Sequence, residues 1–208
     1  MRKSITFGVL DGKKLEWLVI DDDGDALTLW CRSAVAKMSY AKNYSPFYDE
    51  SGVRDFLENE LYEKAFSPEE RAKILQTELD LSENQTYYGA FNGGATAYRR
   101  EPITARIYLL SAREIIKTYA IEAEEIYRAE AQMLWTRSPF SEQTVSLVNC
   151  KREILDGKSP YTYISESYNP ISDTYNSTTV PYSAYPTAEH SVVPALRIKK
   201  DLIYGDLR

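Results

Sequence analysis

Histidine and cysteine are almost absent from this sequence. Its 208 residues include a single histidine, His190, and two cysteines, Cys31 and Cys150. One histidine removes the commonest general base from nearly every position, and a catalytic triad or a multi-histidine zinc site would have to use that residue. We interpret His190 as a solvated or hydrogen-bonded loop residue. The sequence therefore predicts no catalytic residue, no metal site and no cofactor.

The two cysteines lie far apart in the sequence and neither has the histidine close by. Two buried thiols are the ordinary arrangement in a reducing compartment, and a disulfide between Cys31 and Cys150 is the alternative. We expect neither cysteine to be catalytic.

Basic clusters and long apolar runs are also missing. The 25 Lys and Arg are scattered among 31 Asp and Glu, for a net charge of −6, so a nucleic-acid partner is not expected. No apolar run approaches the roughly 18 residues of a membrane span. The first residues, MRKSITFGVLDGKK, lack a signal-peptide core. We expect a cytoplasmic protein, although a trimmed leader or a partner could still place it on a virion or cell surface.

One long stretch has no Lys or Arg at all, from Ser159 to Leu196. Within it, residues 159–187 hold six of the 17 Tyr and six Ser. Serine and proline are typical of disordered segments, but aromatics are not. Binding loops combine Tyr with Ser and Asn, because Tyr offers a large contact area at a low entropic cost.

The N-terminal third alternates apolar and polar residues. Residues 4–31 predict three antiparallel strands, and Asp11-Gly12 is a strong signal for a tight hairpin turn between the first two. The run DDDGD at 21–25 could be interpreted as a calcium-binding loop. It lacks the ligand spacing and preceding helix of an EF-hand loop, so we favour a plain acidic turn.

Helices are predicted next, at 51–66 and 67–75. The second begins with Ser67, Pro68 and Glu70, which together make a capping box. A strand, a polar loop over 82–102 and a strand over 103–111 follow. Ser111 with Glu114 predicts the cap of a third helix, which residues 121–131 continue.

Apolar strands are predicted on both sides of the Tyr-rich stretch. Residues 132–140 and 144–150 precede it, and residues 190–203 form a final strand that must rejoin a sheet to bury its apolar residues. The stretch is thus an excursion from a folded scaffold, and we expect 159–187 to be ordered against that scaffold. Three apolar residues could anchor it: Ile164, Ile171 and Val180.

The cluster WTRSP at 135–139 favours a structural role. Trp135 and Arg137 share one face of a strand, where the indole would be buried and the guanidinium could lie beneath it or pair with an acidic partner in the core.

Five segments taken in order resemble one large family of bacterial and phage domains. They are ITFGVLDGKKLEWLVI, VRDFLENELYEKAFSPEE, RIYLLS, WTRSP and VVPAL. Members of that family look like "F-G…G…I-E-W-x-V-L", "L-R-x-W-L-N-x-x-F-Y-x-x-A-F-S-x-x-E", "V-F-L-L-S", "W-x-R-S-P" and "V-R-P-A-L". Here Val193 stands where the last motif usually has Arg, which puts any core ion pair of that Arg in doubt.

The family is similar to C-type-lectin-like domains of the formylglycine-generating-enzyme type, which include variable proteins of diversity-generating retroelements. The resemblance implies an α+β fold with antiparallel sheets and two to four short helices. It also implies that the C-terminal part displays ligand-contacting residues on a fixed scaffold. Formylglycine formation needs a reactive pair of cysteines late in the chain, and only Cys150 is late.

These observations predict one domain over 1–208, with an N-terminal sheet and helices over 1–134 and a C-terminal sheet with the Tyr-rich display segment over 135–208. We expect a non-catalytic module that binds a protein or glycan. An oxidative enzyme of the formylglycine-generating type and a structural phage or cell-surface subunit are the alternatives. The oligomeric state is left open. The expected ligand-binding residues are Tyr161, Tyr163, Tyr168, Asn169, Tyr175, Asn176, Tyr182 and Tyr185.

Overall fold

Three antiparallel strands open the chain, as predicted: β1 (Ser4–Leu10), β2 (Lys13–Asp22) and β3 (Ala26–Cys31). The turn between β1 and β2 is the expected one, because Asp11 and Gly12 both have positive φ, 49° and 76°. The structure, a computed structural model, describes residues 3–81, 101–121, 133–139, 143–149, 162–169, 174–181 and 183–200.

The helix predicted over 51–66 is present, with an unexpected π-helical centre. A 3₁₀ turn η1 (Tyr48–Glu50) leads into α1 (Gly52–Asp55), the π-helix η2 (Phe56–Leu61) and α2 (Tyr62–Ala65). The hydroxyl of Ser51 caps α1 by accepting a hydrogen bond from the Arg54 amide at 3.1 Å. Inside the π-helix, a carboxylate oxygen of Glu58 accepts hydrogen bonds from the amides of Arg106 and Ile107. The π-helix is thereby fastened to the sheet.

The second predicted helix is shorter than expected. Helix α3 (Pro68–Arg71) has the predicted capping box between Ser67 and Glu70. The prediction of helix up to residue 75 was wrong, because Ile74 and Leu75 form strand β5 (Ile74–Leu75) and pair with the last strand of the chain. These apolar residues pair with the edge of a sheet, and this tertiary contact outweighs their local helical pattern.

Helix α5 (Ala112–Ile121) carries the third predicted cap. The Glu114 amide donates to the Ser111 hydroxyl at 3.1 Å, and the Ser111 amide donates to the Glu114 carboxylate at 2.6 Å. The expected continuation to residue 131 lies outside the described residues. The strand predicted over 103–111 divides into β7 (Ile103–Ala105), which pairs with β6 (Thr77–Leu79), and β8 (Ile107–Leu109), which joins another sheet.

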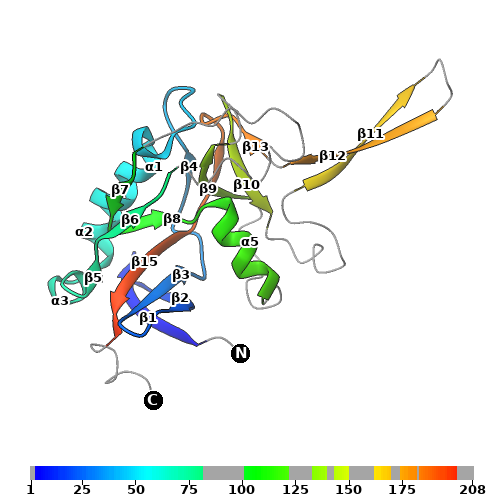
Figure 1. The fold of residues 1–208 in the computed structure, drawn as a ribbon. Coiled ribbons are helices and arrows are strands. Elements are labelled where there is room, and N and C mark those ends of the chain that lie inside the picture. The colour runs from blue at the N-terminus through cyan, green and yellow to red at the C-terminus, as the bar shows by residue number, and fades with distance from the viewer. Residues whose placement is uncertain are drawn as a thin grey trace.

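The C-terminal segment also divides between two sheets. β14 (Glu189–Val192) and β15 (Pro194–Lys199) flank Val193, where one strand had been expected. β15 pairs with β3 on one side and with β5 and β8 on the other, which completes the sheet β1-β2-β3-β15-β5. Figure 1 shows β15 crossing the body beside the N-terminal meander.

A second sheet has the order β13-β10-β9-β14-β4. It combines β9 (Met133–Pro139), β10 (Val145–Asn149) and β13 (Ser183–Ala184) with β4 (Ala36–Ser39), a strand that the sequence did not reveal. Both large sheets therefore take strands from both sides of residue 134. The first sheet receives β15 from the C-terminal part, and the second receives β4 from the N-terminal part.

One core joins the two sheets to the helices. Its largest members are aromatic and almost fully buried, and the indole N–H of Trp17 donates to the Phe7 carbonyl at 2.7 Å. The arrangement is an α+β fold, rich in sheet with few helices, as expected. Among the described helices none is long and apolar enough to cross a membrane. The fully buried aromatic residues are Trp17, Trp30, Tyr40, Tyr48 and Trp135.

Candidate functional site

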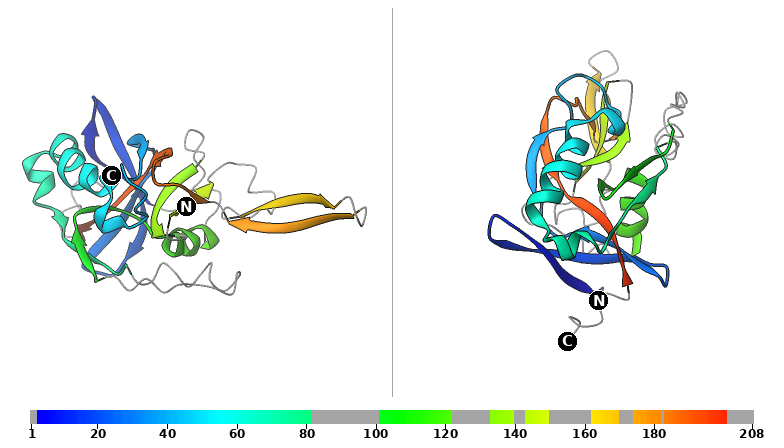
Figure 2. Two further views of the ribbon diagram at one scale, coloured as in Figure 1. Left: turned by 90° about the horizontal axis from the view of Figure 1, so that it is seen from above. Right: turned by 90° about the vertical axis from the view of Figure 1, so that its left-hand side faces the viewer.

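The Tyr-rich stretch forms a β-hairpin that the sequence did not predict as strands. β11 (Thr162–Asn169) and β12 (Thr174–Pro181) pair over eight successive positions without a register shift, and they make a two-stranded sheet of their own. Figures 1 and 2 show this hairpin extending away from the body. Thr, Tyr and Val favour such strands, and the dipeptide Asn-Pro at 169–170 is a sequence signal for a turn.

The expectation that this stretch packs against the scaffold was wrong for β11 and β12. The two strands pair with each other, and their length projects beyond the sheets that bracket them (Figure 2). The bracketing strands do rejoin the body, as the sequence implied, but they carry the hairpin outward. Of the proposed anchors, Ile164 and Val180 are hairpin positions, and Ile171 lies outside the described residues.

Five of the eight predicted ligand-binding residues occupy hairpin positions on two faces. Tyr168 and Tyr175 are directly opposite each other in register, so they share one face of the sheet. The other face contains the remaining three, namely Tyr163, Asn169 and Asn176. Tyr161 and Tyr182 lie outside the described residues.

The eighth predicted residue, Tyr185, lies on the body just after β13. Its side chain is 55% exposed and meets that of Tyr44, which is 64% exposed. The two rings are 6.2 Å apart and nearly perpendicular, a favourable edge-to-face contact. A hydrogen bond of 3.1 Å from the Ala41 amide to the Pro186 carbonyl joins the same two loops. Tyr44 was missed, because only the fold brings it beside Tyr185.

The WTRSP cluster lies in β9, inside the body, and has the predicted structural role. Trp135 is 1% exposed, and its indole N–H donates to the Met38 carbonyl at 2.9 Å. Its ring packs against Tyr40, with centroids 5.2 Å apart. This tryptophan thereby connects β9 to the edge strand β4 and to the loop after it.

Arg137 is 3% exposed and is held by a carboxylate, as predicted. Its two terminal nitrogens donate to both oxygens of Glu114, one of them at 2.9 Å, and one also donates to the Leu109 carbonyl at 3.0 Å. The ring beneath the guanidinium is that of Tyr108, with its centroid 6.0 Å away, and not the indole of Trp135. Burial lowers the pKa of Arg137, but Glu114 outweighs it and raises the pKa, so the guanidinium stays charged.

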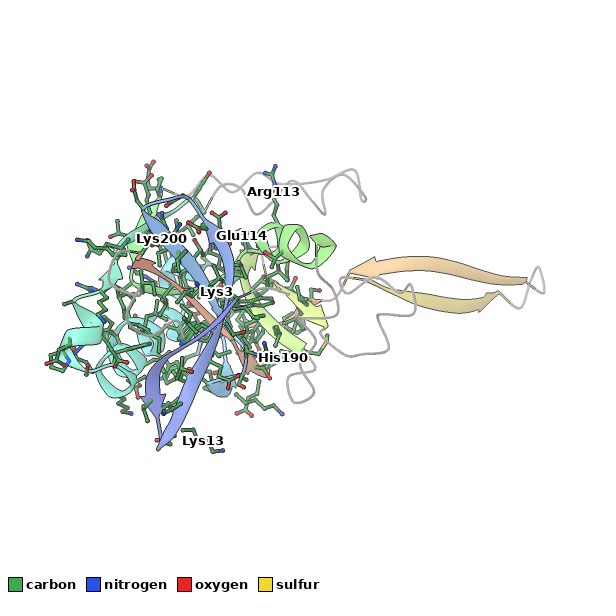
Figure 3. All side chains as sticks on the ribbon, turned by 90° about the horizontal axis from the view of Figure 1, so that it is seen from below. Lys3, Lys13, Arg113, Glu114, His190 and Lys200 are labelled. Carbon is green, nitrogen blue, oxygen red and sulfur yellow. The ribbon has the colours of Figure 1, made fainter. Side chains whose placement is uncertain are left out.

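The same cluster also fixes the start of α5. The Ser138 hydroxyl accepts a hydrogen bond from the Ala112 amide at 2.8 Å, one residue after the cap of the helix. Glu114 thus has two functions, since it closes the capping box and binds Arg137. Figure 3 shows Glu114 and Arg113 side by side on α5, with Arg113 pointing away from the body. Together these contacts make β9 and α5 one rigid unit.

His190 is a strand residue in β14, so its interpretation as a loop residue was wrong. The imidazole lies edge-on to the Trp135 indole, with centroids 4.8 Å apart and planes at 84°. Partial burial, and then the charge of Lys37, lower the pKa of His190 below its ordinary value. The ring is therefore neutral at pH 7 and acts as a packing partner of Trp135.

The acidic run at 21–25 is a turn that also clasps the last strand. The amides of Asp25 and Ala26 donate to the Asp23 carboxylate at 3.1 and 2.8 Å. Asp23 pairs with Arg197, and Asp22 pairs with Lys200 at 2.8 Å. The pKa of Asp22 is lowered by Lys200 and then by the Gly24 amide. Among the described residues no group of three or more His, Cys, Asp or Glu could hold a metal ion.

A pocket of about 480 Å³ lies beside this clasp. Arg197 and Asp23 meet at one side of it, Glu114 and Thr118 of α5 at another, and the Tyr108 side chain contributes an aromatic surface. Three of the charged residues that line it, Asp23, Glu114 and Arg197, already take part in the ion pairs described above, and Asp21 is the fourth. Cys31 is buried in the core at the end of β3, and Cys150 lies outside the described residues, so the disulfide remains an open prediction.

Comparisons of this chain with curated proteins and with solved structures gave no match. One family model, described as a domain of unknown function, DUF6273, matches residues 16–200. The match begins within β2 and ends just after β15, so it includes the second large sheet, the first large sheet apart from β1 and the start of β2, α5, the WTRSP cluster and the hairpin. The chain belongs to the DUF6273 family.

Proposed function

We propose that this chain is a non-catalytic binding module, with a C-type-lectin-like scaffold that presents the hairpin β11–β12 to a protein or glycan ligand. The observation that carries the proposal is the hairpin itself. A Tyr-, Ser-, Thr- and Asn-rich segment without Lys or Arg extends from a body whose own side chains are closely packed.

The composition of the hairpin fits recognition through contact area and neutral hydrogen bonds. Tyr supplies large, rigid surfaces, and Ser and Asn supply adaptable donors and acceptors. The only charged residue in the two strands is Glu166. Binding should therefore depend weakly on ionic strength, unlike binding at a charge-steered interface. Figure 3 places Lys3, Lys13 and Lys200 on the body, away from the hairpin.

The body supports the proposal as a scaffold that can tolerate change in what it displays. The contacts of Trp135, Arg137 and Glu114 join β9 to β4 and α5 without using a hairpin residue. We further propose that a diversity-generating retroelement varies the hairpin sequence. This proposal predicts a reverse-transcriptase gene near this one, with a template repeat that covers the codons of residues 162–181.

The direct test is a screen of the labelled chain against a glycan array and a displayed-peptide library. A matched chain in which a Gly-Ser linker replaces residues 162–181 is screened in parallel. We expect ligands that bind the full chain and not the linker variant. Ligands that bind both chains equally would place the site on the body and contradict the proposal.

The two faces of the hairpin can then be separated. Tyr168→Ala and Tyr175→Ala remove aromatic rings from one face, and Tyr163→Ala removes one from the other. At least one face should contain a change that weakens binding by about 2 kcal/mol or more, the size of a binding hot spot. Tyr185→Ala, on the body, tests whether the exposed pair with Tyr44 belongs to the same surface.

A further inference from the structure

Strand β12 of the hairpin differs from the other described sheet edges, because it is long, regular in register and uncharged. Exposed strand edges are usually protected by shortness, by a bulge, by Lys, or by a covering element. β5 and β13 have two residues each, β6, β7 and β8 have three, and β4 has four, including Lys37.

Among the described strands of the body, β1 is the one long edge, and it is protected in two ways. Its pairing with β2 shifts register between Thr6 and Val9, which marks a bulge. At that bulge the Gly8 amide donates to the Glu70 carboxylate at 2.9 Å, so a group of α3 occupies the edge. β11 and β12, in contrast, run for eight residues each in a regular register.

We propose that strand β12 pairs with β12 of a second copy of this chain, about a two-fold axis, to make a four-stranded sheet β11-β12-β12-β11. Two-stranded hairpins are marginally stable in water, and additional strands stabilise them. A symmetric pairing centred on Thr178 covers positions 175–181 and supplies about six inter-chain backbone hydrogen bonds. The pairing uses backbone edges, so it is independent of whether the hairpin faces bind a ligand.

The charges of the two strands indicate that β12 is the edge that pairs and that its partner is a second copy of β12. β12, with the sequence TYNSTTVP, has no charged residue, so two copies can meet without repulsion. β11 has Glu166 near its centre, and a two-fold axis there would bring two carboxylates together. In a β12 pairing centred on Thr178, that residue meets its own copy at the axis and Ser177 lies opposite Thr179 of the second copy, and hydroxyl-bearing residues are favourable cross-strand partners.

Sedimentation velocity of the full chain, from about 1 to about 500 μM, tests the association. We expect a reversible, concentration-dependent dimer. A chain that remains monomeric throughout that range would overturn the proposal.

A matched pair of lysine variants identifies the edge. Ser165 and Thr178 are opposite each other in the hairpin register, so Lys at either position disturbs the hairpin equally. Thr178→Lys places two ammonium groups near the axis and should weaken dimerisation at least tenfold, whereas Ser165→Lys should change it less than about threefold. Mixing Thr178→Lys with Thr178→Glu should restore a heterodimer. Equal loss in both lysine variants, or greater loss in Ser165→Lys, would overturn the assignment to β12.

Cross-linking gives a second measurement that does not depend on charge. Thr178→Cys should form a disulfide between chains under mild oxidation, and Ser165→Cys, with the same native cysteines, should not. The cross-linking result does not depend on which form of the chain binds a ligand. Failure of the dimer and failure of the binding proposal can therefore be distinguished. Cross-linking in Ser165→Cys alone would contradict the proposal.

Discussion

The body and the hairpin are held together by different interactions. In the body, buried aromatic rings and the ion pair of a buried arginine join separate elements, as Trp135 does for β9 and β4 and Arg137–Glu114 does for β9 and α5. In the hairpin, pairing is local and antiparallel, between segments that are four residues apart in the sequence. The body is therefore specified by long-range packing, and the hairpin by its backbone ladder.

This difference means that the two regions should tolerate different changes. A substitution at Trp135 removes contacts to β4, to Tyr40 and to His190 at once. A substitution on the hairpin affects one cross-strand pair. The contrast is what a display module requires, because the displayed residues can vary while the scaffold keeps its geometry. The following predictions test how independent the two regions are.

The largest effect should come from emptying the aromatic site in β9. Trp135→Ala is expected to lower the free energy of unfolding by about 3–5 kcal/mol, because it removes a fully buried ring and the hydrogen bond to Met38. Urea denaturation measures the change. Tyr185→Ala, at an exposed aromatic of the same body, is the control and should cost less than about 0.5 kcal/mol. A cost below about 1 kcal/mol for Trp135→Ala would show that the ring is not core.

A smaller loss should follow from neutralising the partner of the buried arginine. Glu114→Gln keeps the shape of the side chain but leaves the Arg137 charge without its counter-ion and weakens the cap of α5. We expect a loss of about 2 kcal/mol, since hydrogen bonds to charged groups contribute about 1.5–3 kcal/mol. Glu60→Gln is the control, because it removes a charge from an exposed helix ion pair, that with Lys64, and such surface pairs contribute little. Equal effects of the two changes would contradict the importance of the ion pair.

The body should also be modestly sensitive to pH through His190. Its folded pKa is lowered, so the unfolded chain binds the proton more readily. The contribution of the neutral ring is complete above the unfolded pKa near 6.5 and is lost as the pH falls through the folded pKa. The loss should stay below about 1 kcal/mol, because the side chain is partly exposed. His190→Phe keeps an aromatic ring beside Trp135 and should remove this part of the pH dependence of chemical denaturation between pH 7 and 5. An unchanged profile in the variant would assign that dependence to other groups.

A comparably small effect on stability should come from removing the hairpin. Replacing residues 162–181 with a Gly-Ser linker is expected to shift the melting temperature by no more than about 3 °C, which corresponds to roughly 1 kcal/mol. The reason is that β11 and β12 form a sheet of their own. Differential scanning calorimetry measures the shift. Loss of the folded structure in this variant would show that the hairpin is part of the scaffold.

The sequence was most informative where the structural signal was local. The Asp11-Gly12 turn and the boxes at Ser67 and Ser111 follow from neighbouring residues, and all are present. Burial of Trp135 and the tie of Arg137 to a carboxylate were also predicted correctly, because a strand pattern with a single tryptophan and arginine on one face leaves few alternatives.

Errors occurred where a distant strand determined the outcome. Ile74 and Leu75 have helical spacing but pair with β15, and the segment around Val193 divides because each half joins a different sheet. The hairpin was read as a loop excursion, since its Ser- and Asn-rich strands lack the apolar alternation of a half-buried strand. A hairpin that forms a two-stranded sheet of its own has no need of that alternation.

By itself, the sequence determined the α+β class, the capped helices, the turns and the lack of cationic residues in the display segment, because these depend on composition and on neighbours along the chain. Only the tertiary structure decided that Glu114 neutralises Arg137, that Tyr44 meets Tyr185, that His190 packs on Trp135, and that β12 presents a regular, uncharged edge. The physical reason is that these relations join residues whose separation along the chain carries no information about their distance in space.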